Sequence, residues 1–172
     1  MYFPNRSNTN PRILNIACGT LNEEHAIYEL FGKNTELIGI DNDKMMLSNA
    51  EDLNRQTVMY GDLENLDTYI NGKFDLVLGR NVPLNPGLGR KKSNVSDPWP
   101  NIFSNLKKYM TKNSQLFLTL VREDENKRAK EILTDNDYKI TFTKKNNIIV
   151  PKDYINVHSH NTKDNYIVIA KS

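Results

Sequence analysis

The fold is decided by residues 12–21, which read RILNIACGTL. The first six of them form a short, mostly apolar run, which predicts a strand over 12–17. A loop of small residues around Gly19 follows, and then Asn22, which can cap a helix over 23–31. Small residues let the backbone approach a ligand, and the N–H groups that begin a helix favour anionic groups. The stretch therefore predicts a ligand-binding site on the first strand-to-helix loop.

The same alternation of strand and helix patterns continues along the chain. Further strands are predicted over 36–40, 57–60, 74–79, 115–121, 138–143 and 166–170. Further helices are predicted from 44 to 53, around 66–70, across 102–110 and over 127–135. Alternation of this kind predicts right-handed βαβ units around a buried parallel sheet. No helical pattern separates the last two strands, so we expect them to pair antiparallel at one sheet edge.

Composition and length narrow the class of protein. The 172 residues predict one domain over 1–172, with 1–11 as an irregular lead-in. The net charge of +2, from 23 basic and 21 acidic residues, argues against an extensive basic surface that binds nucleic acid. A single cysteine, Cys18, excludes an internal disulfide. No apolar run reaches membrane-spanning length, and the first residues lack the order of a signal peptide, so a cytoplasmic protein is expected.

Polar residues follow three more of the predicted strands, where an open α/β sheet binds its ligands. Asp41 ends the second strand, about twenty residues after Gly19, and can accept both hydroxyls of a ribose. Asp62 follows the third strand, where it can accept a hydrogen bond from an exocyclic amine. Arg80 and Asn81 follow the fourth strand and would face the reactive end of the ligand.

With these motifs the chain resembles class I S-adenosylmethionine-dependent methyltransferases. Residues 13–21 resemble the first family motif, 39–50 the second, 61–66 the third and 74–78 the fourth strand. The resemblance covers roughly residues 12–124. It implies a Rossmann-like three-layer αβα sandwich, with a seven-stranded, mostly parallel sheet whose last strand is antiparallel. It also implies S-adenosylmethionine as cofactor and methyl transfer as the reaction.

The resemblance also implies a role for each matching residue. The implied cofactor-binding residues are Asn15, Ala17, Cys18, Gly19, Asp41, Asn42, Met46, Asp62, Leu63, Gly79 and Arg80. Within this set the first loop passes under the methionine part and ribose, and Asn42 and Met46 flank the adenine. Arg80 and Asn81 would orient the substrate. No general base is indicated, so the catalytic residues stay unknown.

Three positions depart from the family pattern. The family has an acid at position 15, and Asn15 keeps the acceptor without the charge. Ala17 and Leu21 replace two loop glycines, and an alanine fits only if its backbone does not need a positive φ. These departures leave a second hypothesis open, a non-catalytic S-adenosylmethionine-binding module or a subunit that needs a partner chain. A nicotinamide dehydrogenase is a weaker alternative, because of the replaced glycines and Asp62.

Other features indicate little about chemistry. His158 and His160 could share a strand face, yet no third ligand is near in sequence, so no metal site is predicted. Trp99, between two prolines, is expected to be a packing anchor. The basic cluster 90–92 is expected to be solvated. Residues 80–83 lack the motif of amino-methylating nucleic-acid enzymes, which favours a small molecule or a protein as substrate.

Overall fold

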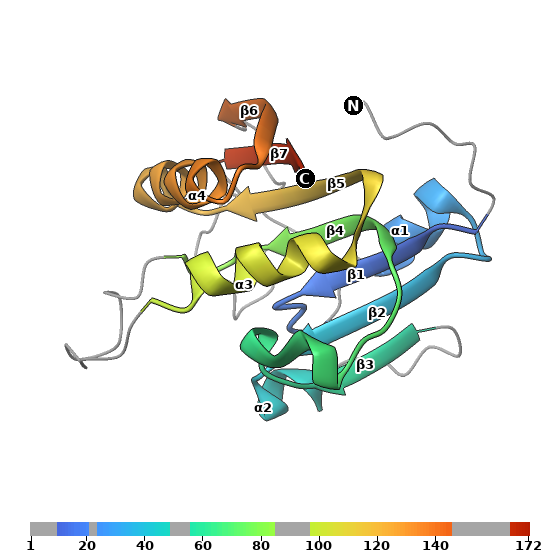
Figure 1. Ribbon diagram of the computed structural model, residues 1–172. Helices are drawn as coiled ribbons and strands as arrows, with labels where there is room; N and C mark the ends of the chain where they lie inside the picture. Colours follow the sequence, from blue (N-terminus) through green and yellow to red (C-terminus); the bar gives the residue numbers. More distant parts are fainter. Residues whose placement is uncertain (1–9, 21–23, 49–55, 85–96, 146–165) are drawn as a thin grey trace, which may run out of the picture.

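The computed structural model describes residues 10–20, 24–48, 56–84, 97–145 and 166–172. They form a twisted sheet with helices on both faces (Figure 1). The strands are β1 (Arg12–Ile16), β2 (Glu36–Asp41), β3 (Gln56–Tyr60), β4 (Phe74–Arg80), β5 (Met110–Leu120), β6 (Lys139–Lys145) and β7 (Tyr166–Lys171). The helices are α1 (Glu24–Phe31), α2 (Lys44–Leu47), α3 (Trp99–Leu106) and α4 (Glu123–Asp135), with 3-10 helices η1 (Leu63–Thr68) and η2 (Lys107–Tyr109).

The sheet has the strand order β3-β2-β1-β4-β5-β7-β6. The first five of these strands pair in parallel, whereas β7 is antiparallel to both β5 and β6. β1 lies between β2 and β4, so the strand order runs in opposite directions on its two sides. The predicted seven-stranded sheet and its antiparallel last strand are confirmed.

Two helical layers cover the sheet, which completes the predicted three-layer sandwich. The larger apolar cluster lies between the sheet and η1, α3 and α4, and it contains Leu14 and Ile16 of β1. The smaller cluster joins Ile13, Leu37 and Leu76 to α1. Successive side chains of β1 thus point to opposite layers, as the pleat of a strand requires. In Figure 1, α3 lies in front of the sheet and α1 behind it.

Some predicted boundaries were wrong. Met110 was assigned to a helix, but it begins β5 and is buried in the larger cluster. The last helix begins at Glu123 rather than Lys127, because the Glu125 carboxylate accepts the N–H groups of Val121 and Arg122, both at 3.2 Å. Such a capping carboxylate satisfies N–H groups that the start of a helix leaves unpaired.

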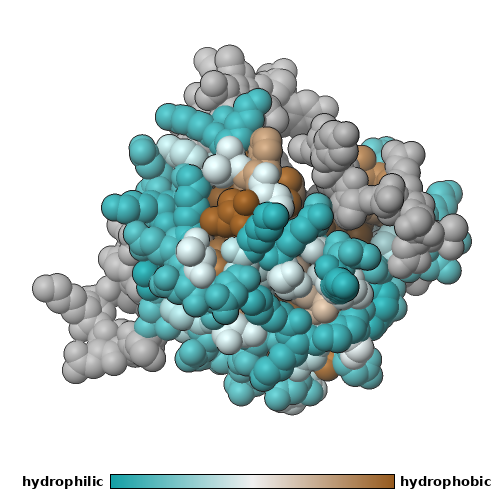
Figure 2. All heavy atoms as spheres, turned by 45° about the horizontal axis from the view of Figure 1, so that its top comes forward, coloured by the Kyte–Doolittle hydropathy of each residue, from teal (hydrophilic) through white to brown (hydrophobic). Residues whose placement is uncertain are grey.

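The larger cluster confirms the packing role predicted for Trp99, whose side chain is 7% exposed. Figure 2 shows a largely hydrophilic outer face with a few apolar side chains visible between polar ones. Among the described residues, no helix is long and apolar enough to cross a membrane.

Several predictions fall outside the described residues. They concern Leu21, the end of the second helix at 49–53, the basic cluster 90–92, and the histidines 158 and 160.

Candidate functional site

The site lies where four parallel strands end side by side. β3, β2, β1 and β4 are neighbours and run in the same direction, so the loops after them meet at one edge of the sheet. The strand order reverses at β1, with β2 and β3 on one side of it and β4 and β5 on the other. Open α/β sheets bind ligands at such a reversal. The residues predicted from sequence are thereby brought to a common edge.

The loop after β1 turns sharply through two residues in the left-handed region. Ala17 has a φ of 50° and Gly19 a φ of 54°. The backbone N–H of Cys18 donates to the Ile40 carbonyl at 3.2 Å, which fixes the loop to β2. The sequence set a condition for alanine at this position, a backbone that does not need a positive φ, and the structure does not meet it. Ala17 therefore carries the strain of a left-handed residue with a Cβ. A Cβ on Gly19 would meet no atom within 4 Å, so open space adjoins that position.

Replacing Ala17 by glycine is therefore expected to stabilise the protein. Relief of left-handed strain, about 1–2 kcal/mol, exceeds the extra chain entropy of glycine, about 0.5–1 kcal/mol. We expect urea denaturation to show a free energy of unfolding up to about 1 kcal/mol higher for A17G. The matched control is A26G, at an exposed position inside α1, which should lower the free energy by about 1 kcal/mol. Equal losses in both variants would contradict the strain at Ala17.

Asp41, at the end of β2, holds two loops together. Its Oδ2 accepts the Gly19 N–H and its Oδ1 accepts the Asp43 N–H, both at 2.8 Å. An ionised carboxylate has about four acceptor positions, so each oxygen can still accept a ribose hydroxyl. Asp43 caps α2 by accepting the N–H groups of Met45 and Met46, as its sequence position predicts. The carboxylate of Asp41 is thus fixed in place before any ligand arrives.

The predicted adenine-binding residues follow β2 and β3. Asn42 and Met46 are exposed at the surface, whereas Leu63 is buried. Asp62 is exposed and caps η1, with its Oδ1 accepting the Glu64 N–H at 3.0 Å. These residues lie at one edge of the sheet, and their binding role stays a prediction.

Tyr60 is an exposed aromatic residue at the same edge of the sheet, and sequence reasoning did not select it. It ends β3, pairs in register with Asp41, and leaves 55% of its surface exposed. The Lys44 ammonium lies 4.7 Å from the centre of its ring. An exposed aromatic ring beside Asp41 is of a kind that can stack on a purine. The signal was an aromatic residue directly before Gly61 and Asp62.

Asn15 places an amide inside the protein next to the first loop. The residue is 1% exposed, and neither Oδ1 nor Nδ2 has a hydrogen-bond partner among the residues that the structure describes. A buried polar group without a partner costs about 1–3 kcal/mol. Native proteins rarely tolerate that cost without a ligand, water or function. The amide therefore fits a cofactor that brings polar groups to this end of β1.

The end of β4 combines close packing with exposed polar residues. Gly79 is buried, and a Cβ there would lie 2.7 Å from Val82 Cγ2 and 2.9 Å from Leu118 Cδ2. The structure thus gives Gly79 a packing role, beside the cofactor role predicted for it. Arg80 and Asn81 are exposed, and Asn81 has a φ of 52° with its N–H donating to the Thr119 carbonyl at 2.9 Å. Both side chains are accessible to a substrate.

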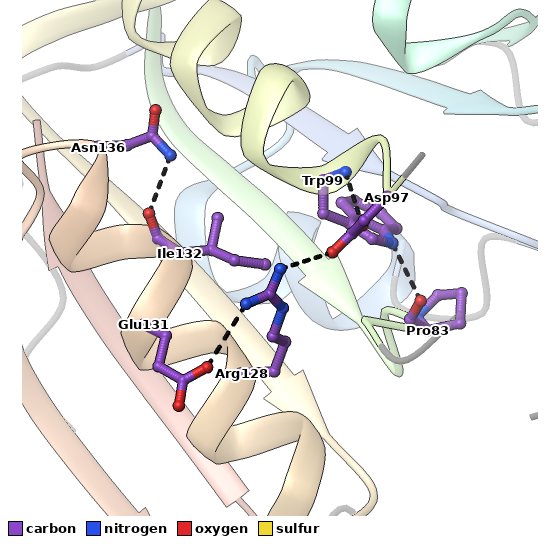
Figure 3. A network of polar contacts seen from close by, with 7 residues as sticks. All are labelled: Pro83, Asp97, Trp99, Arg128, Glu131, Ile132 and Asn136. Carbon is purple, nitrogen blue, oxygen red and sulfur yellow. Dashed lines mark hydrogen bonds and ion pairs between the residues drawn. The ribbon is translucent and has the colours of Figure 1, made fainter. Parts of the chain in front are cut away.

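Polar contacts join Pro83, shortly after β4, and Asp97, before α3, to residues of α3 and α4 (Figure 3). The Trp99 indole N–H donates to the Pro83 carbonyl at 3.0 Å. Asp97 accepts the Trp99 backbone N–H at 3.1 Å and an Arg128 guanidinium N–H at 2.9 Å. The hydrogen bond to Asp97 is the main cause that raises the pKa of Arg128. Pro83 is thus held by Trp99 of α3, and Asp97 is held by Trp99 and by Arg128 of α4.

Comparison with known proteins identifies the family. A family model described as a methyltransferase domain matches residues 7–168. The chain therefore belongs to this methyltransferase family, and its fold is that of the class I S-adenosylmethionine-dependent enzymes. The fold class and the enzyme class predicted from the sequence are confirmed.

Solved structures of low sequence identity share the fold. A precorrin-6y C5,15-methyltransferase from Geobacter metallireducens superimposes with a TM-score of 0.68 at 19% identity, covering 95% of this chain and 81% of that one. The plantazolicin methyltransferase BamL, solved with S-adenosylhomocysteine, gives 0.64 at 14% identity, covering 93% and 76%. A chain of the fibrillarin/Nop5p complex gives 0.63 at 11% identity, covering 95% and 73%. No relative among curated proteins matches the sequence.

Proposed function

We propose that the chain binds S-adenosylmethionine at the ends of β1 to β4 and transfers its methyl group to a nucleophile on a small molecule or a protein. The observation that carries this proposal is the position of the Asp41 carboxylate. Its two oxygens accept the Gly19 and Asp43 N–H groups, and each oxygen can accept one more hydrogen bond. A ribose is the part of the cofactor that this geometry fits. The S-adenosylhomocysteine in the BamL structure supports the choice of cofactor.

S-adenosylmethionine, when bound, supplies an electrophilic methyl group on a sulfonium. In the proposal Asp41 accepts hydrogen bonds from the ribose hydroxyls, and Asp62 accepts one from the adenine amine. The Asn15 Oδ1 accepts a hydrogen bond from the amino group of the methionine part. Arg80 and Asn81 orient the substrate, because methyl transfer needs the nucleophile in line, and positioning supplies much of the rate. No general base is assigned, since positioning can suffice for this reaction.

A second candidate is a binding module or a subunit that requires a partner chain. The observations that favour it are the strained Ala17 and the neutral Asn15 in the first loop. The fibrillarin/Nop5p complex shows that a chain of this fold can be part of a complex. Cytoplasmic location and a single domain over 1–172 stay predictions.

Isothermal titration with S-adenosylhomocysteine, followed by transfer of a labelled methyl group to substrate pools, tests both candidates. The leading proposal expects saturable binding at one site per chain, and labelled product from a small-molecule or protein pool. Binding without labelled product from any pool would favour the module, and product that appears only after a partner is added would favour the subunit. No saturable binding at millimolar ligand would contradict both.

A further inference from the structure

Within the described residues, the half of the sheet formed by β5, β7 and β6 has a helical layer on only one of its faces. We propose that the other face binds an amphipathic helix of a partner protein, one whose apolar stripe is bordered by acidic residues. This inference does not depend on cofactor binding, and it adds a surface for a protein partner to the proposed function. Sequence reasoning did not select this surface.

The first step is the cover that each face of this half receives. On one face, Val168 and Ala170 of β7 pack in the larger apolar cluster with residues of α4. On the other face, the smaller cluster beneath α1 extends as far as Phe117 of β5. Neither cluster contains Ile167 or Ile169 of β7. No helix in the described part of the chain therefore covers this face of β7 and β6, which form the sheet edge opposite β3 (Figure 1).

The sequence of β7 is typical of a strand that is covered on both faces. Residues 166–170 read YIVIA, with an apolar or aromatic side chain at every position. A strand with one face in water alternates apolar and polar residues, whereas a strand covered on both faces is apolar throughout. Ile167 and Ile169 alternate with the residues that face α4, and both are only half-buried. The composition of β7 thus indicates a second layer, on the face where the described residues place no helix.

The strand register arranges the side chains of this face in three rows. Each row contains one residue from β5, one from β7 and one from β6, because residues paired across a sheet point to the same face. The rows are Gln115, Lys171 and Lys139; Phe117, Ile169 and Phe142; and Thr119, Ile167 and Lys144. The middle row is entirely apolar, and Phe142 at its outer end is 44% exposed. We call these nine residues the open face.

The open face carries three positive charges and no negative one. Lys139 and Lys171 lie on one side of the apolar row, and Lys144 lies on the other side. All three residues are exposed, and none of them forms an ion pair within the described ranges. Lys139 and Lys171 are directly opposite each other, and like charges in that arrangement destabilise a strand pair. A partner with carboxylates on both sides of an apolar stripe would neutralise all three charges.

The dimensions of the open face fit one α-helix. Neighbouring strands lie about 4.8 Å apart, so three strands span about 10 Å, which is the diameter of a helix with its side chains. The six residues of β7 extend about 20 Å, a length that about 14 helical residues match. A strand added beside β6 would leave Ile167 and Ile169 uncovered. A second copy of the chain would present the same lysines and no acid, so an acidic helix is the better fit.

Fluorescence anisotropy of labelled model peptides tests the inference on the full chain of 172 residues. The acidic probe is a helical peptide of about 18 residues, with leucines in one stripe and glutamates on both sides of it. The control peptide has lysine in place of every glutamate. The wild-type protein should bind the acidic probe saturably at micromolar concentration, and about tenfold or more tightly than the control peptide.

Variants of exposed residues connect the binding to the open face. F142S removes the exposed ring and should raise the dissociation constant of the acidic probe about tenfold or more. K144E reverses one bordering charge and should raise the constant about fivefold, with a smaller effect at high salt. K127E is the matched charge reversal at an exposed position of α4, and it should stay within about twofold of wild type. Circular dichroism shows whether each variant is folded.

Absence of saturable binding of the acidic probe to the wild-type protein would overturn the inference, and so would equal affinity for the two peptides. Binding that F142S and K144E leave unchanged would also overturn it, because the probe would then bind elsewhere. A dimer in light scattering that F142S dissociates would assign the open face to a second copy instead. Binding to vesicles of phosphatidylcholine and phosphatidylserine that F142S abolishes would assign it to a lipid surface. None of these results depends on the proposed function, because all are measured without S-adenosylmethionine.

Discussion

Replacing Asp41 by alanine is expected to weaken S-adenosylhomocysteine binding by about 1.5–3 kcal/mol, which is roughly a tenfold to hundredfold rise in the dissociation constant. The variant loses the acceptors for the ribose. It also loses the 2.8 Å hydrogen bonds from the Gly19 and Asp43 N–H groups, so the first loop loses one of its hydrogen bonds to the end of β2 and keeps the backbone bond from Cys18 to Ile40. Titration calorimetry measures the change directly.

Asp43 offers a matched control two residues away. D43A removes the cap of α2 and should lower the free energy of unfolding by about 1 kcal/mol, while the hydrogen bond from its backbone N–H to Asp41 can persist. D41N keeps one carbonyl oxygen and should bind with intermediate affinity. If D41A and D43A weaken binding equally, Asp41 has no special place in the site.

The order of the elements could be predicted because the patterns that define them are local. Apolar runs at β1, β2 and β4 and the three- and four-residue spacing of α3 and α4 are visible in short windows of sequence. Boundaries depend on longer-range contacts. Met110 satisfies a helical apolar spacing, yet it pairs with Phe74 across the sheet. The early start of α4 depends on where the Glu125 side chain finds its N–H partners.

Candidate site residues could be named from sequence, but their backbone conformations and hydrogen-bond partners could not. The sheet topology brings Asp41 and Gly19 together across 22 residues, and only the fold shows that the carboxylate holds the loop. The φ of Ala17 depends on the path of the chain between β1 and α1, and composition does not reveal it. The same holds for the unpartnered amide of Asn15. The enzyme class was therefore easier to predict than the backbone strain and the buried polar group near the first loop.

Replacing Gly79 by alanine is expected to destabilise the protein by about 1–3 kcal/mol, the usual cost of overpacking a core. The new Cβ would lie 2.7 Å from Val82 Cγ2, 2.9 Å from Leu118 Cδ2 and 3.2 Å from Ile16 Cγ1. All three neighbours are fully buried, so they have little room to move. Urea denaturation of G79A against wild type gives the difference in the free energy of unfolding.

Two variants identify the clash as the cause. G32A places a Cβ where nothing lies within 4 Å, at a φ of +93°, so its cost is backbone strain of about 1–2 kcal/mol alone. G79A/V82A removes the nearest methyl group, and the double variant should lose less stability than the sum of the two single variants. Strict additivity would contradict the packing role. Since Gly79 pairs with Ile16 at the site end of β1, we also expect G79A to weaken cofactor binding, and V82A to recover part of it.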